Sequence, residues 1–166
     1  MRFTAEQRFP DTSPQEVAAA FADPALYDGY PTGDRLAAPE VVGHQVDGER
    51  VELRLQYRFI GDLSSAVRAV VDPARLTWVE QTAHDLGSCT ASFALHPDHY
   101  ADRLRCSGTV QVVADGTGAR RVVTGDLKVK VPLVGGSVER TLVADLQDHL
   151  RQETAIVEAF LERRSG

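Results

Sequence analysis

Alternation of apolar and polar side chains runs through most of the segment from Glu40 to about residue 131, and no other feature constrains the fold as strongly. A period of two is typical of strands that bury one face. Asp47-Gly48 is a tight-turn signal and predicts a hairpin. The stretch from Gly61 to Asp72 is compatible with a short helix or an irregular edge. The six predicted strands are Glu40 to Val46, Val51 to Phe59, Leu76 to Ala83, Ser88 to Leu95, Arg103 to Val113 and Arg120 to Val131. Their short connections predict an antiparallel sheet.

A further strand and two short helices are predicted before this segment. Arg2–Phe9 alternates in the same way and makes a seventh strand. Ser13-Pro14-Gln15-Glu16 combines an N-cap, a proline at the first helical position and a glutamate that can complete a capping box, so a helix is expected through Ala22. Asp23-Pro24 repeats the cap-plus-proline signal and predicts a second helix to about Tyr30.

The C-terminal segment has the spacing of one long helix. Gly135-Gly136 breaks the strand pattern, and Ser137 can serve as the N-cap of this helix. About 26 residues at 1.5 Å each give a helix of about 40 Å, which matches the roughly 35 Å of the longest strands. The residues that recur at helical spacing are Val138, Leu142, Leu146, His149, Glu153, Ile156 and Phe160.

A single helix is narrow compared with a seven-stranded sheet, so the sheet is expected to curve around it. The space left between them is then either filled by side chains or remains as a cavity. Several inward positions are small, which favours an apolar cavity suited to a lipophilic ligand. The inward set, by phase, is Val51, Leu53, Leu55, Tyr57, Phe59, Leu76, Trp78, Cys89, Ala91, Phe93, Leu95, Leu104, Cys106, Gly108, Val110, Val112, Val123, Gly125, Leu127 and Val129.

Composition narrows the classes of function. The length of 166 residues fits one domain, residues 1–166. The chain has 24 acidic and 18 basic side chains, and the resulting net charge of −6 is unfavourable for binding to nucleic acid or to anionic lipid surfaces. No apolar run approaches the roughly 20 residues of a membrane span, and the N-terminus lacks a secretory apolar segment, so we expect a cytoplasmic protein. The sequence has two cysteines, Cys89 and Cys106, and we expect both to be reduced thiols. It has no Cys-x-x-Cys or His-x-x-x-His spacing, so we expect no metal and no cofactor.

The predicted order of elements resembles the START-like superfamily, also called SRPBCC, helix-grip or Bet v 1-like. Within it, the segments MRFTAEQRFP, GHQVDGERVELRLQYRFIGDL, RLTWVEQ and KVKVPLVGGSVERTL resemble an actinobacterial family described as a domain of unknown function, DUF2505. The resemblance implies an α+β helix-grip fold, a curved seven-stranded antiparallel sheet wrapped around the C-terminal helix. It also implies a cavity that relatives use for sterols, lipids, polyketides or plant hormones, and it assigns no catalytic residues.

His149 and Glu153 lie four residues apart and share the phase of Leu142 and Leu146, so they can pair inside the cavity. Such a pair can orient a polar ligand group or move a proton. The alternative is an apolar stripe that leaves His149 at its margin, through Leu146, Leu150, Val157 and Leu161.

Glu80 follows Leu76 and Trp78 in phase, which predicts a buried carboxyl group with a raised pKa. A bulge or strand end beyond Trp78 would instead turn Glu80 outward. Trp78 and Tyr57 can contact a ring-bearing ligand or belong to the core, and Tyr27 and Tyr30 can line the opening or simply pack.

The predicted ligand-binding set collects these positions. It comprises Tyr27, Leu55, Tyr57, Phe59, Trp78, Glu80, Phe93, Val110, Leu127, Leu142, Leu146, His149 and Glu153. Arg120-Arg121 and Arg163-Arg164 are expected on a solvated surface, and Gly135-Gly136 is expected to act as a hinge or turn.

The leading hypothesis is binding of a hydrophobic small molecule, lipid, sterol-like or polyketide-like, without catalysis. One alternative is a polyketide cyclase or dehydratase that uses Tyr57, Glu80, His149 and Glu153, because an enzyme needs several polar groups that converge on the substrate. Another is a module with a filled core whose surface binds a protein.

Overall fold

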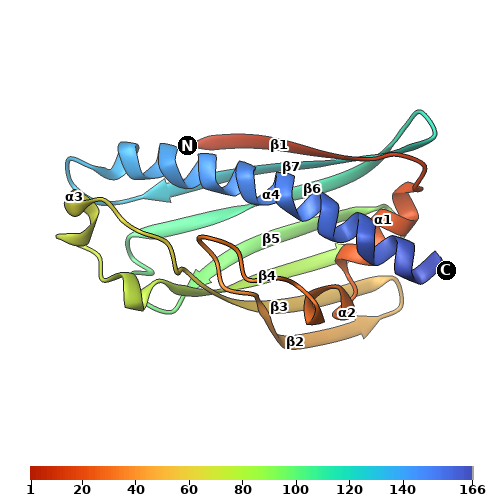
Figure 1. Cartoon of the computed structure of the whole chain (residues 1–166), viewed down its shortest axis with the longest axis horizontal. Coiled ribbons are helices and arrows are strands. Elements are labelled where there is room, and N and C mark those ends of the chain that lie inside the picture. The colour runs from red at the N-terminus through yellow and green to blue at the C-terminus, as the bar shows by residue number, and fades with distance from the viewer. Residues whose placement is uncertain (166) are drawn as a thin grey trace.

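The computed structural model describes residues 1–165, and it contains the predicted antiparallel sheet and long C-terminal helix (Figure 1). The strands are β1 (Arg2–Phe9), β2 (Glu40–Asp47), β3 (Arg50–Arg58), β4 (Thr77–Asp85), β5 (Thr90–Pro97), β6 (Leu104–Asp115) and β7 (Gly118–Val129). The helices are α1 (Pro14–Phe21), α2 (Ala25–Asp28), α3 (Ser65–Arg68) and α4 (Gly135–Ser165). The predicted α+β helix-grip fold is confirmed, and the stretch from Gly61 to Asp72 holds a short helix.

The seven strands form one open sheet in the order β1-β7-β6-β5-β4-β3-β2. Alternate residues of each strand face α4, and one inner row runs through Phe3, Gly125, Gly108, Phe93, Thr82 and Leu53. The inward phase predicted for the strands is confirmed by this register. Cys89 and Leu76 lie outside the ladders, because Cys89 has a φ of 56° in the turn before β5 and Leu76 precedes β4.

The capping box predicted before α1 is present. The Ser13 hydroxyl accepts a hydrogen bond from the Glu16 amide at 3.2 Å, and the Ser13 amide donates to the Glu16 carboxylate at 3.0 Å. Ser13→Ala is therefore expected to lower the free energy of unfolding by about 1 kcal/mol in urea titrations. Ser137→Ala is the control, because the structure places Ser137 inside α4 and not at its cap. Equal effects of the two changes would contradict the prediction.

Helix α4 begins at Gly135, two residues before the predicted cap. The Gly135 amide donates to the Val131 carbonyl at 2.9 Å, so the first turn forms directly after the strand. A Cβ at Gly135 would lie 2.6 Å from the Val129 carbonyl oxygen, and this close approach requires glycine. The Glu139 carboxylate accepts from the Val129 amide at 2.9 Å and holds the start of the helix against the end of β7.

Helix α4 packs most closely against β1, β7 and α1, and it crosses the sheet diagonally from the β1 side toward α1 (Figure 1). Two hydrophobic clusters result. One joins α1, α2 and β3 to Val157 and Phe160 of α4, and the other joins β1, β6 and β7 to Val143 and Leu150. Among residues 1–165, none of the helices is long and apolar enough to span a bilayer.

Candidate functional site

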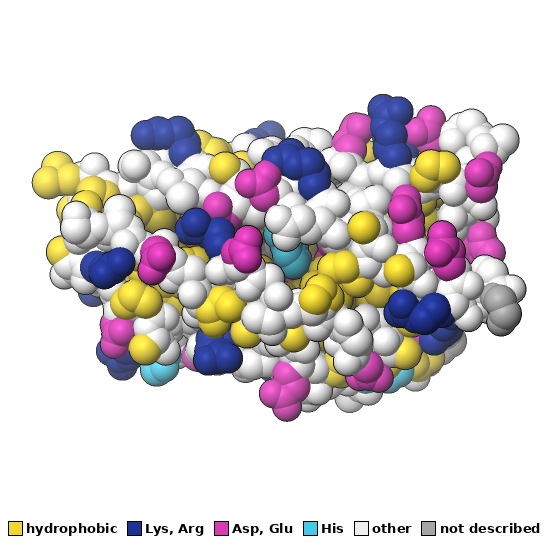
Figure 2. All heavy atoms as spheres, in the orientation of Figure 1, with side chains coloured by type: hydrophobic (Ala, Val, Ile, Leu, Met, Phe, Trp, Pro, Cys, Tyr) yellow, Lys and Arg dark blue, Asp and Glu magenta, His cyan; other side chains and the backbone are white. Residues whose placement is uncertain are grey.

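The middle strand of the sheet is incompletely covered on its inner face. Ala91, Phe93 and Leu95 face inward on β5, the middle strand, yet all three remain partly exposed, whereas Leu53 and Leu55 of β3 are 0% and 1% exposed. Hydrophobic side chains gather in a band beside α4 (Figure 2), where the loops that lead from α2 to β2 and from β3 to α3 pass in front of the sheet (Figure 1). We use the name inner trough for the partly exposed residues between α4 and the middle of the sheet, which are Trp78, Glu80, Phe93, Leu95, Leu142 and Leu146.

Glu153 of α4 is the centre of a buried polar cluster at the inner face. Only 6% of the residue is exposed. Its carboxylate accepts from the Tyr30 hydroxyl at 2.6 Å and from the Gln7 amide nitrogen at 3.3 Å. The His149 ring nitrogen Nε2 lies 3.6 Å from the same carboxylate. The helical spacing of His149 and Glu153 therefore brings them together, but the phenol that joins them belongs to Tyr30 and not to Tyr57.

Arg121 supplies the positive charge of this cluster, which corrects the prediction that it lies on a solvated surface. Its guanidinium Nη1 donates to the Gln7 side-chain oxygen at 2.6 Å and lies 3.8 Å from the Glu153 carboxylate, and the side chain is 12% exposed. The guanidinium carbon also stacks over the Phe21 ring at 3.8 Å. Arg121 faces inward because it pairs with Gln7 of β1 and Val112 of β6 in the inner rows.

Glu80 faces the trough from β4, whereas Glu153 belongs to α4 and Arg121 to β7. The β3–β4 ladder runs without a shift from Arg50 to Arg58, so no bulge turns Glu80 outward, and Glu80 pairs with Leu55 and Leu95. Burial raises the pKa of the Glu80 carboxyl group to about 7, and the negative charge of Glu153 raises it further while Arg121 opposes the rise. Glu80 is thus poised to exchange a proton near neutral pH.

His84 and Thr82 continue the inner face of β4 and were absent from the predicted set. His84 is buried, and its Nε2 lies 3.0 Å from the Thr82 hydroxyl. Burial, and secondarily the charge of Arg121, lowers the pKa of His84 to about 4, so the ring is neutral near neutral pH. Extending the alternation of Trp78 and Glu80 by two positions identifies both residues.

Tyr57 and Trp78 form a stacked pair across β3 and β4, with ring centroids 5.8 Å apart and an interplanar angle of 11°. Tyr57 is buried and Trp78 is partly exposed. Burial, and secondarily Glu80, raises the pKa of the Tyr57 phenol above its ordinary value. On the inner face, this pair is the next cross-strand pair after Leu55 and Glu80.

Two predicted residues lie away from the trough. Tyr27 is buried, donates its hydroxyl to the Phe21 carbonyl at 2.9 Å and stacks on Tyr30. Phe59 follows β3, bridges to Leu36 and lies under the Arg35 guanidinium. Val110 and Leu127 face inward and belong with Phe93, Leu142 and Leu146 to the second hydrophobic cluster.

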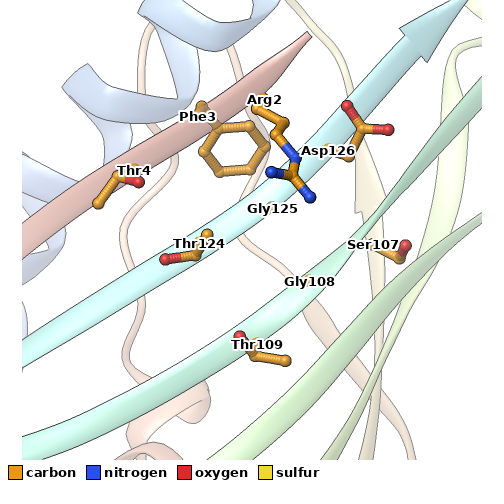
Figure 3. A pocket seen from close by; sticks show the side chains of 9 residues that line it. All are labelled: Arg2, Phe3, Thr4, Ser107, Gly108, Thr109, Thr124, Gly125 and Asp126. Carbon is orange, nitrogen blue, oxygen red and sulfur yellow. The ribbon is translucent and has the colours of Figure 1, made fainter.

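Two surface hollows lie apart from the inward side chains of β4 and β5. One, of about 500 Å³, lies on the outer face over the glycine pair Gly108 and Gly125 and is lined by short polar side chains such as Thr109 and Thr124 (Figure 3). The other, of about 360 Å³, lies near the start of β2 and includes Gln56 and Asp98. Within residues 1–165, no His, Cys, Asp and Glu side chains cluster as a metal site would require, and Cys89 and Cys106 are free and buried.

Solved structures with the same fold have low sequence identity to this chain. TTHA0849 from Thermus thermophilus is 19% identical with a TM-score of 0.70, over 100% of both chains. Zhui aromatase/cyclase from Streptomyces sp. R1128 is 14% identical with a TM-score of 0.61, over 100% of this chain and 97% of that one. Norcoclaurine synthase from Thalictrum flavum is 17% identical with a TM-score of 0.62, over 98% of this chain and 87% of that one. These likenesses show the helix-grip fold.

Comparisons of the sequence alone give fewer matches than comparisons of the structure. No curated protein matches the chain. A family model described as "Protein of unknown function (DUF2505)" matches residues 4–161.

Proposed function

The chain belongs to the family described as "Protein of unknown function (DUF2505)", and from this membership and the geometry of the inner face we propose that it binds a hydrophobic small molecule between the sheet and α4. One observation carries the proposal. The inward side chains of the middle strand, Ala91, Phe93 and Leu95, are partly exposed, whereas the inward side chains of β3 and β7 are buried, among them Leu53, Leu55, Val123 and Leu127.

Partly exposed apolar side chains on an inner face are unfavourable in water, by roughly 25 cal/mol for each Å² left uncovered. A ligand that covers Phe93, Leu95 and Leu146 removes this penalty. The partly exposed wall also argues against a core filled by its own side chains, which is what a module acting only through its outer surface requires.

Native mass spectrometry of the protein purified from its own host tests the proposal. We expect a bound molecule that organic solvent removes. Ala91→Phe places a ring next to Phe93 at one end of the trough and is expected to abolish the adduct, whereas Ala83→Phe on the outer face of the neighbouring strand is expected to leave it unchanged. Circular dichroism checks that both variants fold. A wild-type protein without an adduct, or an adduct that Ala91→Phe retains at full occupancy, would contradict the proposal.

A second candidate function is acid–base catalysis of the polyketide cyclase or dehydratase type. Two carboxyl groups in different surroundings favour it, because Glu153 is held by four polar side chains and Glu80 has a pKa of about 7. Turnover of a bound polyketide-like compound that Glu80→Gln abolishes would favour the enzyme over the binding protein.

A further inference from the structure

Glu80 is the charged group in the inner trough that has no partner. Within the described chain, no hydrogen bond or ion pair reaches its carboxylate, and Leu55 and Leu95 flank the residue on the inner face. The residue is partly exposed. A carboxylate between apolar neighbours is stabilised by a donor or a cation, and a ligand that displaces water from the inner trough has to supply one.

The positive charge of the interior is the Arg121 guanidinium, and it already has partners within the protein. Arg121 donates to Gln7, lies beside Glu153 and has one face of its guanidinium covered by the Phe21 ring. His84 is neutral and contacts Thr82. An anionic ligand would therefore meet Glu80 without a free cation to compensate, whereas a cationic ligand would find an unpaired carboxylate.

An aromatic surface lies next to that carboxylate. Trp78 precedes Glu80 by two residues on the same face, and its ring stacks on Tyr57 from the neighbouring strand. Aromatic faces attract ammonium groups through their quadrupole, and an adjacent carboxylate adds a full charge. Carboxylate and rings together are complementary to an alkylammonium group.

We propose that the inner trough selects a lipophilic amine, whose ammonium group lies between Glu80 and the Tyr57–Trp78 pair while its apolar part lies along Phe93 and Leu95. This inference rests on the proposed function and names the chemical class of its ligand. Two carboxylates against one engaged guanidinium make the same site unfavourable for a fatty carboxylate.

Binding of an amine is expected to strengthen as the pH rises. The carboxyl group of Glu80, with a pKa of about 7, goes from mostly protonated at pH 6 to mostly ionised at pH 8, while a primary amine stays protonated. The titratable and charged groups around Glu80 are Glu153 and His149 from α4, Arg121 from β7, Tyr57 from β3, Cys106 from β6, His84 from β4, and Tyr27 and Tyr30 from α2 and the residues after it.

Isothermal titration calorimetry with three probes of one carbon skeleton tests the inference: 4-phenylbutylamine, 4-phenylbutan-1-ol and 4-phenylbutanoate. At pH 8 we expect the amine to bind about tenfold more tightly than the carboxylate, and its affinity to fall about tenfold at pH 6. Glu80→Gln is expected to weaken the amine about tenfold and the alcohol less than about twofold. Glu52→Gln, on the outer face of β3, is the matched control.

The outcomes separate the two proposals. If the alcohol binds but the amine is no tighter than the carboxylate, or if Glu80→Gln leaves the preference intact, the selection of amines is wrong and hydrophobic binding stands. If none of the probes binds, both proposals fail. Trp78→Leu is a second variant, and a lower affinity for the amine with an unchanged affinity for the alcohol would support the aromatic contact.

Discussion

Glu153→Leu is expected to lower the free energy of unfolding by about 3–5 kcal/mol, because it leaves a buried charge without its partner. The change removes the acceptor of the Tyr30 hydroxyl and the carboxylate beside Arg121, which is 12% exposed. Arg121 cannot turn to solvent easily, since Phe21 and Gln7 hold it. Urea unfolding at neutral pH measures the loss, and thermal unfolding should show a drop of roughly 10 °C.

Glu158→Leu is the matched control on the same helix. Glu158 is exposed, so the same chemical change there is expected to alter stability by about 0.5 kcal/mol or less. A double-mutant cycle with Tyr30→Phe isolates the hydrogen bond, and we expect a coupling energy of about 1–3 kcal/mol. A loss at Glu153 no larger than the loss at Glu158 would mean that the buried cluster does not stabilise the fold.

The strands and their inner faces were predictable because the signal is local. One apolar face per strand gives a period of two, and the register of Val110, Val123 and Leu127 follows from it. The same period contains Arg121, two positions before Val123, and Gln7, between Ala5 and Phe9. Charge suggested a solvated surface for Arg121, but phase is the stronger signal, since a single arginine can be buried when carboxylate and amide partners face it.

The position of α4 and the partner of Glu153 were not predictable in the same way. Helical spacing places His149 and Glu153 on one face, but it does not say over which strands that face lies. The helix packs on β1 and β7, and Tyr30 reaches Glu153 from a loop 123 residues away in sequence. Such contacts depend on how the elements dock, and a pattern within one element carries no information about docking.

Two glutamates at one inner face are thus expected to have opposite effects on stability. Glu153 is surrounded by donors and stabilises the fold. Glu80 faces the same interior without a partner, which is unfavourable for its charged form. A partly exposed residue that destabilises the free protein is typical of a site whose partner is the ligand.

Glu80→Gln is accordingly expected to stabilise the protein by about 2–3 kcal/mol at pH 8, and to leave it unchanged near pH 4.5. The carboxyl pKa rises from its ordinary value of 4.5 to about 7 on folding. Between these values the folded protein keeps a proton that the unfolded chain has released, so stability falls as the pH rises through this window. Below pH 4.5 both states are protonated, and the glutamine has no advantage.

Urea unfolding of wild type and Glu80→Gln at a series of pH values measures this difference. Comparing the two proteins at each pH cancels His84, whose pKa of about 4 gives the opposite slope, a loss of stability as the pH falls below about 6.5. Glu52→Gln, on the solvated face of β3, should track the wild type throughout. A Glu80→Gln protein that is no more stable than wild type at pH 8 would show that Glu80 is solvated or paired in the free protein. The unpaired carboxylate on which the selection of an amine depends would then be absent.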